Sequence, residues 1–398
     1  MVKESIKINV PPSKSLSQRV LYARFWGGGR MKIHNLSQAE DVKVFAKIEK
    51  SIKSLSGNTV CDKVVIDVNE SGFWFRVLAA SLPVWGKGFL LTGSGSLRNR
   101  DFSSLKNALL PLGVQLAFSD TGLPVEVSGK LFPGEFEVDA SFSSQHISGL
   151  LFTLPLLDGD TVLYLREPVS VPYLKMTMDL LNEFGIAVRW LDNTRIYVPG
   201  NSVYRLPESY YVENDWSAAA FFAVYGALVR PVTIVGIQTD SVQGDAYVAQ
   251  LMFHAGNVVR ETENGVAFAP GMQQPVGADL TDYPDLFPPL AVYAAFANGT
   301  SVLKGVHRLT NKESNRADAL VKEFSKAGVY ITLDEDKMVV KGNSTIKQAS
   351  LSSHNDHRIA MALAMLSVIS GVTLHIDNRE CVAKSFPDFF EELKKLKI

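Results

Sequence analysis

The feature that most constrains the fold is a repeat of about seventy residues. Four segments with the pattern of an amphipathic helix end in glycine at positions 113, 185, 256 and 328, so that consecutive glycines lie 72, 71 and 72 residues apart. The four segments are residues 105–113, 178–185, 248–256 and 320–328. A glycine in that place suits the left-handed residue that closes a helix. The spacing therefore predicts four helices, each ending at its glycine.

A second series of segments keeps the same spacing. Short runs with strand character occupy residues 88–91, 160–165, 231–235, 300–303 and 371–376, each after a more apolar helix pattern. Each unit therefore reads as strand, apolar helix, strand, amphipathic helix and strand. A shorter, divergent first unit ends near Gly57, and a final helix is expected over residues 386–398. Six such units favour two domains of three units each, whereas the alternative is chance agreement within a generic α/β chain.

Length and composition agree with a large globular protein. A chain of 398 residues is too long for one ordinary hydrophobic core, which also favours two domains. A net charge of -1 argues against a protein that binds nucleic acid or an anionic membrane. The amino-terminal segment lacks the apolar run of a signal peptide, and the most apolar window, residues 359–372, is too short to span a membrane. We therefore expect a cytoplasmic protein.

No metal and no cofactor are expected. Cys61 and Cys381 match no metal-binding spacing and do not suggest a disulfide framework. His, Cys and Asp residues do not cluster at ligand spacing. The nucleotide-binding patterns GxGxxG and GxxxxGK do not occur either.

Short polar clusters precede several apolar helix patterns. Ser13-Lys14-Ser15 opens the chain, Ser143-Ser144-Gln145 lies near its middle, and Asn355-Asp356-His357-Arg358 lies near its end. Each places hydroxyl, amide or cationic groups in the first turn of a helix, where unpaired N–H groups and the helix dipole favour an anion. Several such helix ends in one chain indicate a pocket for more than one phosphate or carboxylate.

These clusters belong to a longer ordered set of motifs. The set comprises Lys14-Ser15 with Arg19, Leu97-Arg-Asn-Arg100, Ser143-Ser-Gln145, Ser170-Val-Pro-Tyr173, Gln243-Gly-Asp245, Pro284-Asp285, Lys312-Glu-Ser-Asn-Arg316, Asp356-His-Arg-Ile-Ala-Met361 and Lys384-Ser-Phe-Pro-Asp388. In order and spacing it resembles the 5-enolpyruvylshikimate-3-phosphate synthase family, essentially from end to end. The resemblance implies an α/β (α+β) chain with the two-domain, inside-out, barrel-like enolpyruvyl transferase fold, in which each domain holds three βαβαββ units. It places residues 1–12 and 214–398 in one domain and residues 13–213 in the other, with the active site in the cleft between them.

The resemblance also implies a reaction of the shikimate pathway of aromatic amino acid biosynthesis. The 5-hydroxyl of shikimate 3-phosphate joins C2 of phosphoenolpyruvate, and phosphate is then expelled. An alcohol is a weak nucleophile and an enol is a weak electrophile until C3 is protonated, so the site needs an acid, a base and dense positive charge. The implied partners are these two small molecules, without nucleic acid or membrane, and the implied assembly is a monomer.

The resemblance assigns roles residue by residue. The catalytic set is Lys14, Asp285, Glu313 and His357, where Glu313 exchanges the proton at C3, Asp285 faces the shikimate hydroxyl and His357 orients a substrate. Residues that match the phosphoenolpyruvate site are Lys14, Gly72, Arg100, Gln145, Arg316, Arg358 and Lys384. Residues that match the shikimate 3-phosphate site are Ser15, Arg19, Ser143, Ser144, Gln145, Ser170, Asp285 and Lys312.

Each assignment has a structural alternative. A Lys or Arg most often forms a surface salt bridge, and this alternative is stronger for Arg100 than for Arg358 or Lys384. The serines at 143 and 144 would serve equally well as helix caps. Glu313 could form an i,i+3 ion pair with Arg316.

The sequence departs from the family pattern where an amide, a glycine and a threonine normally face phosphoenolpyruvate. Here Glu70 replaces the uncharged amide and Phe73 the small hydroxyl residue, although Gly72 and Arg76 are retained. A carboxylate facing an anion is unfavourable by about 1–3 kcal/mol unless a cation neutralises it or it turns away. Trp216 stands where a small residue is usual, and Arg308 where an asparagine often contacts shikimate 3-phosphate.

Three functions remain open at this point. The first is an active carboxyvinyltransferase with altered affinity for phosphoenolpyruvate. The second is a catalytically impaired homologue that binds only shikimate 3-phosphate, which the changes at residues 70–77 motivate. The third is the related enolpyruvyl transfer to UDP-N-acetylglucosamine, which the position of neither cysteine favours.

Overall fold

The computed structural model describes residues 5–57 and 63–397, so Cys61 lies outside the described part of the chain. The chain divides into two compact units. Unit 1 comprises Met1–Lys14, Ser37–Glu40 and Glu213–Ile398, and unit 2 comprises Ser15–Leu36 and Asp41–Val212. Within the described residues, no helix combines the length and the apolar character that a membrane span requires.

The repeat predicted from the glycine spacing is present in both units. Four repeats each carry a four-stranded sheet in which the first two strands are parallel and the last two form an antiparallel hairpin. In unit 2, the first complete repeat consists of β3 (Val64–Asp67), α4 (Gly72–Ser81), β4 (Phe89–Thr92), α5 (Ser103–Leu109), β5 (Val114–Phe118) and β6 (Val125–Gly129). The second consists of β7 (Gly134–Asp139), α6 (Gln145–Thr153), β8 (Thr161–Arg166), α7 (Val171–Glu183), β9 (Arg189–Trp190) and β10 (Arg195–Val198).

Unit 1 contains the other two complete repeats. One consists of β1 (Ile6–Asn9), α8 (Trp216–Leu228), β12 (Val232–Val235), α9 (Tyr247–His254), β13 (Val258–Thr262) and β14 (Gly265–Ala269). The other consists of β15 (Gly277–Asp279), α10 (Phe287–Phe296), β16 (Thr300–Lys304), α11 (Arg316–Lys326), β17 (Ile331–Asp334) and β18 (Lys337–Lys341).

The two remaining repeats have sheets of only two strands. The divergent first repeat contains α1 (Lys14–Trp26), β2 (Lys32–His34), α2 (Glu40–Lys43), α3 (Phe45–Ser56) and, from later in the chain, β11 (Ser209–Tyr211), which pairs with β2. The last repeat contains β19 (Ala349–Leu351), α12 (His357–Ser370), β20 (Leu374–Ile376) and α13 (Phe389–Lys394).

The expected final helix over residues 386–398 is therefore too long. Pro387 disfavours the helical conformation at the residue before it, and the α-helix starts only after Asp388.

The four glycines behave as their spacing predicts. Gly113, Gly185, Gly256 and Gly328 have φ angles of 83°, 83°, 78° and 93°, in the left-handed region that a residue with a Cβ atom rarely adopts. The five strand-like segments become β4, β8, β12, β16 and β20, each of which pairs in parallel with the preceding strand of its repeat. Both predicted series are thus confirmed.

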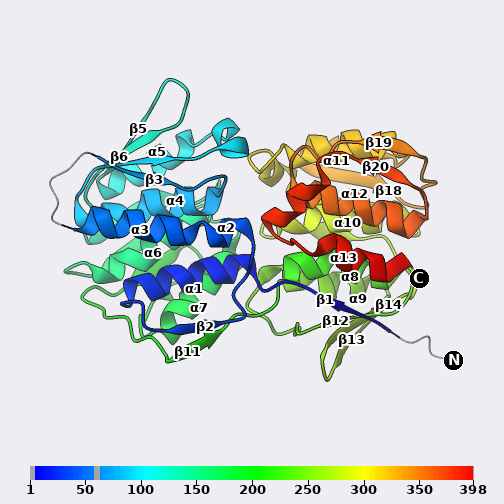
Figure 1. Ribbon diagram of the computed structural model, residues 1–398, viewed down its shortest axis with the longest axis horizontal. Helices are drawn as coiled ribbons and strands as arrows, with labels where there is room; N and C mark the ends of the chain where they lie inside the picture. Colours follow the sequence, from blue (N-terminus) through cyan, green and yellow to red (C-terminus); the bar gives the residue numbers. More distant parts are fainter. Residues whose placement is uncertain (1–4, 58–62, 398) are drawn as a thin grey trace. The chain divides into compact units, whose positions relative to one another are not determined.

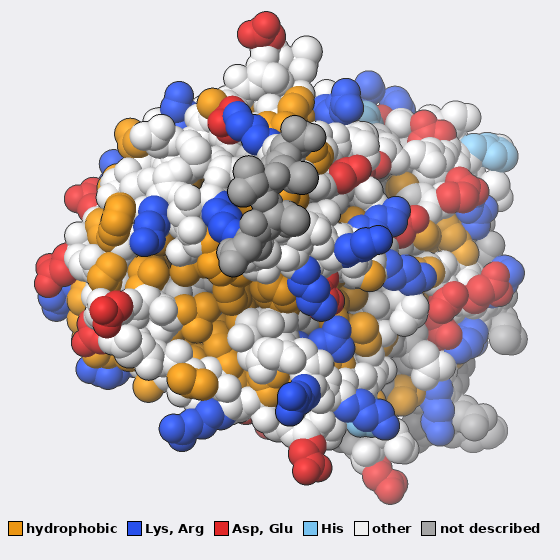
Figure 2. Space-filling view, turned by 60° about the vertical axis from the view of Figure 1, so that its left-hand side comes forward, with side chains coloured by type: hydrophobic (Ala, Val, Ile, Leu, Met, Phe, Trp, Pro, Cys, Tyr) orange, Lys and Arg blue, Asp and Glu red, His pale blue; other side chains and the backbone are white. Residues whose placement is uncertain are grey.

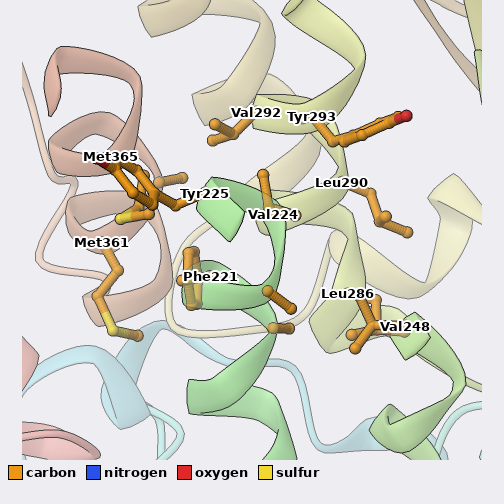
Figure 3. Close-up of a cluster of buried hydrophobic side chains, with 14 of the residues drawn as sticks. Phe221, Val224, Tyr225, Val248, Leu286, Leu290, Val292, Tyr293, Met361 and Met365 are labelled. Atoms are coloured by element: carbon orange, nitrogen blue, oxygen red, sulfur yellow. The ribbon is translucent and has the colours of Figure 1, made fainter. Parts of the chain in front are cut away.

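The apolar helix of each repeat is buried, and its amphipathic helix lies outside. In unit 1, α8, α10 and α12 pack side by side, as Figure 1 shows. Phe221, Val224 and Tyr225 of α8 lie between side chains of the other two helices, such as Leu290 and Met365 (Figure 3). In unit 2, α4 and α6 form the corresponding interior pair. Because the helices are inside, their amino-terminal ends can present polar groups at one end of each unit.

Candidate active site

Arg316 lies at the centre of a charged cluster in unit 1. Its guanidinium donates from Nη1 to Asp285 at 2.7 Å, from Nη2 to Glu313 at 2.7 Å and from Nε to Asp356 at 2.8 Å. The side chain is only 2% exposed. Glu313 precedes α11 in an irregular segment, so its i,i+3 ion pair with Arg316 is present but is not a pair within a helix. The guanidinium of Arg316 thereby connects residues at the starts of α10, α11 and α12.

Asp285 is held between two arginines. It follows Pro284 in a short 3₁₀ turn before α10, and its second oxygen accepts from Nη2 of Arg358 at 2.9 Å. Burial alone would raise the pKa of Asp285, but the charges of Arg358, Lys312 and Arg316 outweigh it and hold the pKa well below its usual range. Asp285 is therefore ionised in the unliganded protein and would be a weak base until a substrate changes its surroundings.

Lys312 and Arg308 contribute further positive charge. Burial lowers the pKa of Lys312 to about 8, against the opposing effect of Asp285. Burial likewise lowers the pKa of Arg308 to about 10, and its Nε donates to the carbonyl of Thr281 at 3.3 Å. Both side chains remain mostly protonated at neutral pH. Arg308, where the family often has asparagine, therefore adds a cation beside Asp285.

His357 is the first residue of α12 and is 1% exposed. Burial, followed by the nearby charge of Lys14, lowers its pKa well below the ordinary value. Neither ring nitrogen has a hydrogen-bond partner within the described residues. A neutral imidazole in this state offers one donor and one acceptor to a ligand.

Two lysines complete the set in unit 1. The backbone N–H of Lys14 donates to Asp215 at 2.9 Å, a contact within unit 1. Lys384 ends a 3₁₀ segment, Arg379–Lys384, that packs against α12, and it is 7% exposed. Lys14, Asp285, Lys312, Glu313, Arg316, His357 and Arg358 are thus brought together by contacts or by mutual electrostatic influence in unit 1.

Unit 2 gathers a second group around the start of α4. Nη1 of Arg76 donates to the side-chain oxygen of Gln145 at 3.1 Å and to the carbonyl of Gly72 at 3.3 Å. A Cβ atom on Gly72 would lie 2.2 Å from Nη1 of Arg100 and 3.0 Å from Nη1 of Arg76. Glycine is therefore required at position 72 for two guanidinium groups to lie over the start of the helix. Arg100 also lines a hollow of about 310 Å³ with Arg98, Phe102 and Phe118.

The predicted serines lie at helix starts in unit 2. Ser143 accepts the backbone N–H of Gln145 at 3.1 Å, which is the capping role that the alternative foresaw. Ser144 occupies the N-cap position of α6 but makes no capping bond through its side chain. Ser170 precedes α7 with a φ of 54°, a left-handed conformation that is uncommon for serine. All three are nearly buried.

Arg19 is more deeply enclosed than a residue of an open binding pocket. It is 1% exposed and donates to the hydroxyl of Thr177 at 2.7 Å and to the carbonyls of Ser15 and Tyr173 at 2.9 and 3.3 Å. Burial lowers its pKa to about 10. Its guanidinium also lies over the ring of Phe73, 5.1 Å from the ring centre. Arg19 therefore joins α1 to α7 and contacts Phe73, one of the residues that depart from the family pattern.

The two unusual residues before and in α4 both have protein partners. Glu70 accepts the backbone N–H of Ser96 at 3.1 Å and the hydroxyl of the same residue at 2.8 Å, so its carboxylate holds the loop that leads to Arg100. Phe73 is 7% exposed and packs edge-on against Trp74. Trp216, the other bulky departure, is buried in unit 1 and donates from its indole N–H to the carbonyl of Gln238 at 3.0 Å.

Sequence reasoning missed two residues that hold this group together. Asp356 was quoted only as part of a motif, yet it caps α12 through the N–H of Arg358 at 2.9 Å and binds Arg316. Asp215 accepts from Lys14 and caps α8 through the N–H of Ala218 at 2.9 Å. An Asp immediately before a helix pattern is the signal that could have identified both.

No group of His, Cys, Asp and Glu within residues 5–57 and 63–397 is arranged to hold a metal ion.

Known proteins resemble this chain over nearly its whole length. A sequence profile described as EPSP synthase (3-phosphoshikimate 1-carboxyvinyltransferase) matches residues 3–393. A protein of that name from Clostridium kluyveri is 32% identical, covering 98% of this chain and 94% of its own length. Another, from Brachyspira hyodysenteriae, is 35% identical over 88% of this chain and 83% of its own length.

Solved structures give the same fold. EPSP synthase from Acinetobacter baumannii superposes with a TM-score of 0.75 at 23% identity, over 98% of this chain and 96% of that one. The enolpyruvyl transferase NikO from Streptomyces tendae also reaches 0.75, at 16% identity over 99% and 95%. At these identities the likeness establishes the two-domain enolpyruvyl transferase fold, and the sequence comparisons establish the relationship. This chain belongs to the EPSP synthase family.

Proposed function

We propose that this protein transfers the 1-carboxyvinyl group of phosphoenolpyruvate to the 5-hydroxyl of shikimate 3-phosphate and releases inorganic phosphate. The observation that carries the proposal is the family match across residues 3–393. Relatives named 3-phosphoshikimate 1-carboxyvinyltransferase, which cover 98% of the chain, support the same reaction. The monomer implied by the resemblance and the cytoplasmic location expected from the sequence remain predictions.

The reaction is an addition followed by an elimination. A proton adds to C3 of phosphoenolpyruvate, the hydroxyl oxygen bonds to C2 and loses its proton, and a tetrahedral intermediate forms. Loss of a proton from C3 then expels phosphate and restores the double bond as an enol ether. Charge grows on the phosphate as it leaves, so fixed cations stabilise this step more than the ground state.

In unit 1 we assign the acid–base work to two carboxylates. Glu313 would exchange the proton at C3, and Asp285 would accept the proton of the 5-hydroxyl. The depressed pKa of Asp285 fits this role only if a substrate anion draws Arg358 or Lys312 away from it, because a carboxylate shared by cations is a poor base. Neutral His357 would donate a hydrogen bond to a substrate oxygen without adding charge.

The cations divide into those that bind substrate and those that organise the site. Lys14, Arg358 and Lys384 would hold the phosphate and carboxylate of phosphoenolpyruvate. Arg316 already bonds to three carboxylates, which use most of the donors of a guanidinium. It therefore has little capacity left for substrate, and its main task would be to hold Asp285, Glu313 and Asp356 in place.

In unit 2 we assign the residues at the starts of α1, α6 and α7 to shikimate 3-phosphate. Ser15, Ser143, Ser144, Gln145 and Ser170 would offer hydroxyl, amide and backbone N–H groups to its phosphate and hydroxyls. Arg19 would contribute mainly by supporting these helices, whereas Gly72, Arg100 and Gln145 would face phosphoenolpyruvate.

The binding-only alternative loses its motivation. It rested on Glu70 and Phe73 occupying positions where polar, uncharged groups face phosphoenolpyruvate. Glu70 bonds to Ser96, and Phe73 packs against Trp74 and Arg19. Neither relationship requires the loss of phosphoenolpyruvate binding.

The test is release of inorganic phosphate by the purified protein. Release should require both phosphoenolpyruvate and shikimate 3-phosphate, and Glu313→Ala should reduce it by orders of magnitude, since one acid–base group contributes about 10²–10⁴-fold. UDP-N-acetylglucosamine in place of shikimate 3-phosphate should give no release. Wild-type protein that releases nothing at saturating concentrations of both substrates would end the proposal.

A further inference from the structure

The segment that leads into α12 contains two consecutive residues in a conformation that L-amino acids disfavour. His354 and Asn355 have φ angles of 52° and 54°, and neither is glycine. Such residues persist only where their surroundings hold them in place. The next three residues are Asp356, which caps α12, and then His357 and Arg358 of the candidate site. The conformation of this turn therefore sets the positions from which the side chains of His357 and Arg358 extend.

A fully buried carboxylate on α11 holds the turn. One oxygen of Glu323 lies 3.0 Å from Nε2 of His354, and the other accepts the backbone N–H of Ser352 at 3.0 Å. Glu323 is 0% exposed, although it lies on an amphipathic helix. Because a carboxylate only accepts hydrogen bonds, Nε2 of His354 must carry the proton in this contact.

Helix α11 also contacts residues 352–356 at a second point. Arg316 lies seven positions before Glu323, so the two side chains share a face of α11 about two turns apart. Arg316 binds Asp356, and Glu323 binds Ser352 and His354. Residues 352–356 are thus fastened to α11 at both ends. On the other side, Asn378 donates from its side-chain amide to Asn355 at 2.8 Å.

We infer that Glu323 and His354 are positioning residues for the start of α12. They hold the left-handed turn, which sets the direction of the helix cap at Asp356 and hence the reach of Arg358 toward Asp285, a contact of 2.9 Å. Neither residue belongs to the proposed substrate contacts. The kinetic consequence rests on the proposed function, in which Arg358 binds phosphoenolpyruvate.

The competing explanation is that Glu323 only stabilises α11. It also forms an i,i+3 ion pair with Lys326, whose Nζ lies 2.7 Å from one of its oxygens. Lys326 makes no contact with the turn in the hydrogen bonds of the described residues, which makes it a matched control. Lys326→Gln removes one partner of Glu323 and leaves the turn alone, whereas changes at His354 remove a different one.

Two substitutions at His354 separate the hydrogen bond from the backbone conformation. His354→Asn keeps a residue that tolerates the left-handed region but is too short to reach Glu323, whereas His354→Gln keeps a donor near the position of Nε2. We expect His354→Asn to raise the KM for phosphoenolpyruvate by about fivefold, the change that corresponds to about 1 kcal/mol for one lost hydrogen bond. The KM for shikimate 3-phosphate should change less than about twofold, and both His354→Gln and Lys326→Gln should stay close to wild type.

Hydrogen–deuterium exchange supplies a measurement that does not depend on activity. In the free protein, peptides covering residues 352–360 should exchange faster in His354→Asn than in wild type, His354→Gln or Lys326→Gln, while peptides of α8 stay unchanged. Unchanged exchange in His354→Asn, or equal acceleration in Lys326→Gln, would overturn the inference. Faster exchange with an unchanged KM for phosphoenolpyruvate in an active enzyme would contradict the proposed effect of the turn on substrate binding. Wild-type protein without turnover would instead count against the proposed function, and exchange would still decide whether the turn is held.

Discussion

The carboxylate of Asp215 accepts the backbone N–H of Lys14 at 2.9 Å, although 201 positions separate the two residues in the chain. The other oxygen of the same carboxylate caps α8 through Ala218. Nearby, the N–H of Ser13 donates to the carbonyl of Glu213 at 2.7 Å, and the N–H of Asp215 donates to that of Pro11 at 2.8 Å. One side chain therefore caps α8 and holds the backbone of a candidate catalytic lysine.

The first prediction separates these two roles of Asp215. Asp215→Ala should lower the free energy of unfolding by about 0.5–2 kcal/mol, the range for a lost helix cap, and should also lower kcat/KM. Asp215→Asn keeps one oxygen for the cap, but its NH₂ group cannot accept from Lys14. It should retain most of the stability and still lose activity, as measured by urea unfolding and by phosphate release. Full activity in Asp215→Asn would mean that this contact does not position Lys14.

The second prediction concerns the cluster around Arg316. Arg316→Lys keeps the positive charge but replaces a guanidinium that bonds to three carboxylates with a single ammonium, which cannot reach all three, so buried carboxylate oxygens lose their donors. The free energy of unfolding should fall by at least about 1–3 kcal/mol in denaturant titrations, the cost of one buried group left without its hydrogen bond.

The matched control is Arg195→Lys, in a pair with Asp192 whose side chains are 44% and 42% exposed. Its effect should stay within about 1 kcal/mol. Equal effects of the two substitutions would show that the Arg316 cluster is not a buried, interdependent unit.

The third prediction is a pH dependence of stability that arises from His146. Burial lowers the pKa of His146 to about 4. The hydrogen bond to the carbonyl of Asp139 has the opposite effect on this pKa, but it is weaker than the effect of burial. Above a pH of about 6.5 the folded and unfolded states are both neutral at this residue, and no stability is lost. As pH falls toward 4, the unfolded state binds a proton that the folded state does not, so stability declines.

At pH 5 this decline amounts to about 2 kcal/mol. His146→Gln preserves a donor to Asp139 and does not titrate, so it should lose less stability than wild type between pH 7.5 and pH 5. Urea titrations at the two pH values measure the difference. Parallel losses in the two proteins would contradict a neutral, buried His146.

The fourth prediction distinguishes two effects of Glu70. If its carboxylate repels phosphoenolpyruvate, Glu70→Ala should lower the KM for that substrate. We expect the opposite, an increase of about fivefold, because the change removes both bonds to Ser96 and loosens the loop that carries Arg100. Steady-state kinetics at saturating shikimate 3-phosphate decide between them. Glu126→Ala, which removes an exposed pair with Lys63, should leave the KM unchanged.

The sequence was most informative where local physics decides the structure. Gly113 and its three counterparts end helices because only glycine adopts a left-handed conformation at little cost, so their spacing predicted the repeat. Ser143 before α6 and Asp356 before α12 accept backbone N–H groups of the following residues for an equally local reason. The final helix was overestimated because Pro387 shortens it at its start.

Other features depend on contacts between distant segments. Nothing in the neighbourhood of Lys14 indicates that Asp215 holds it, and nothing near Glu323 indicates that it supports His354. The direction of Glu70 depends on a loop 26 positions away. An arginine can bind a substrate anion or carboxylates of the protein itself, so the sequence identified Arg316 as part of the site but not as the cation that three carboxylates share.

Some polar and apolar surface has no assigned role. Hydrophobic side chains form a patch bordered by Lys and Arg side chains on the face drawn in Figure 2. Exposed hydrophobic side chains are common on globular proteins, and they do not by themselves indicate a partner.

The most direct test of the account follows the proton at C3. The protein, phosphoenolpyruvate and shikimate 3-phosphate are incubated in D₂O, and the product is examined by proton NMR. Protonation and deprotonation at C3 should place deuterium in the methylene group of the new enol ether, and Glu313→Gln should form product at least about a hundredfold more slowly. Product without deuterium, or wild-type rates in Glu313→Gln, would contradict the account.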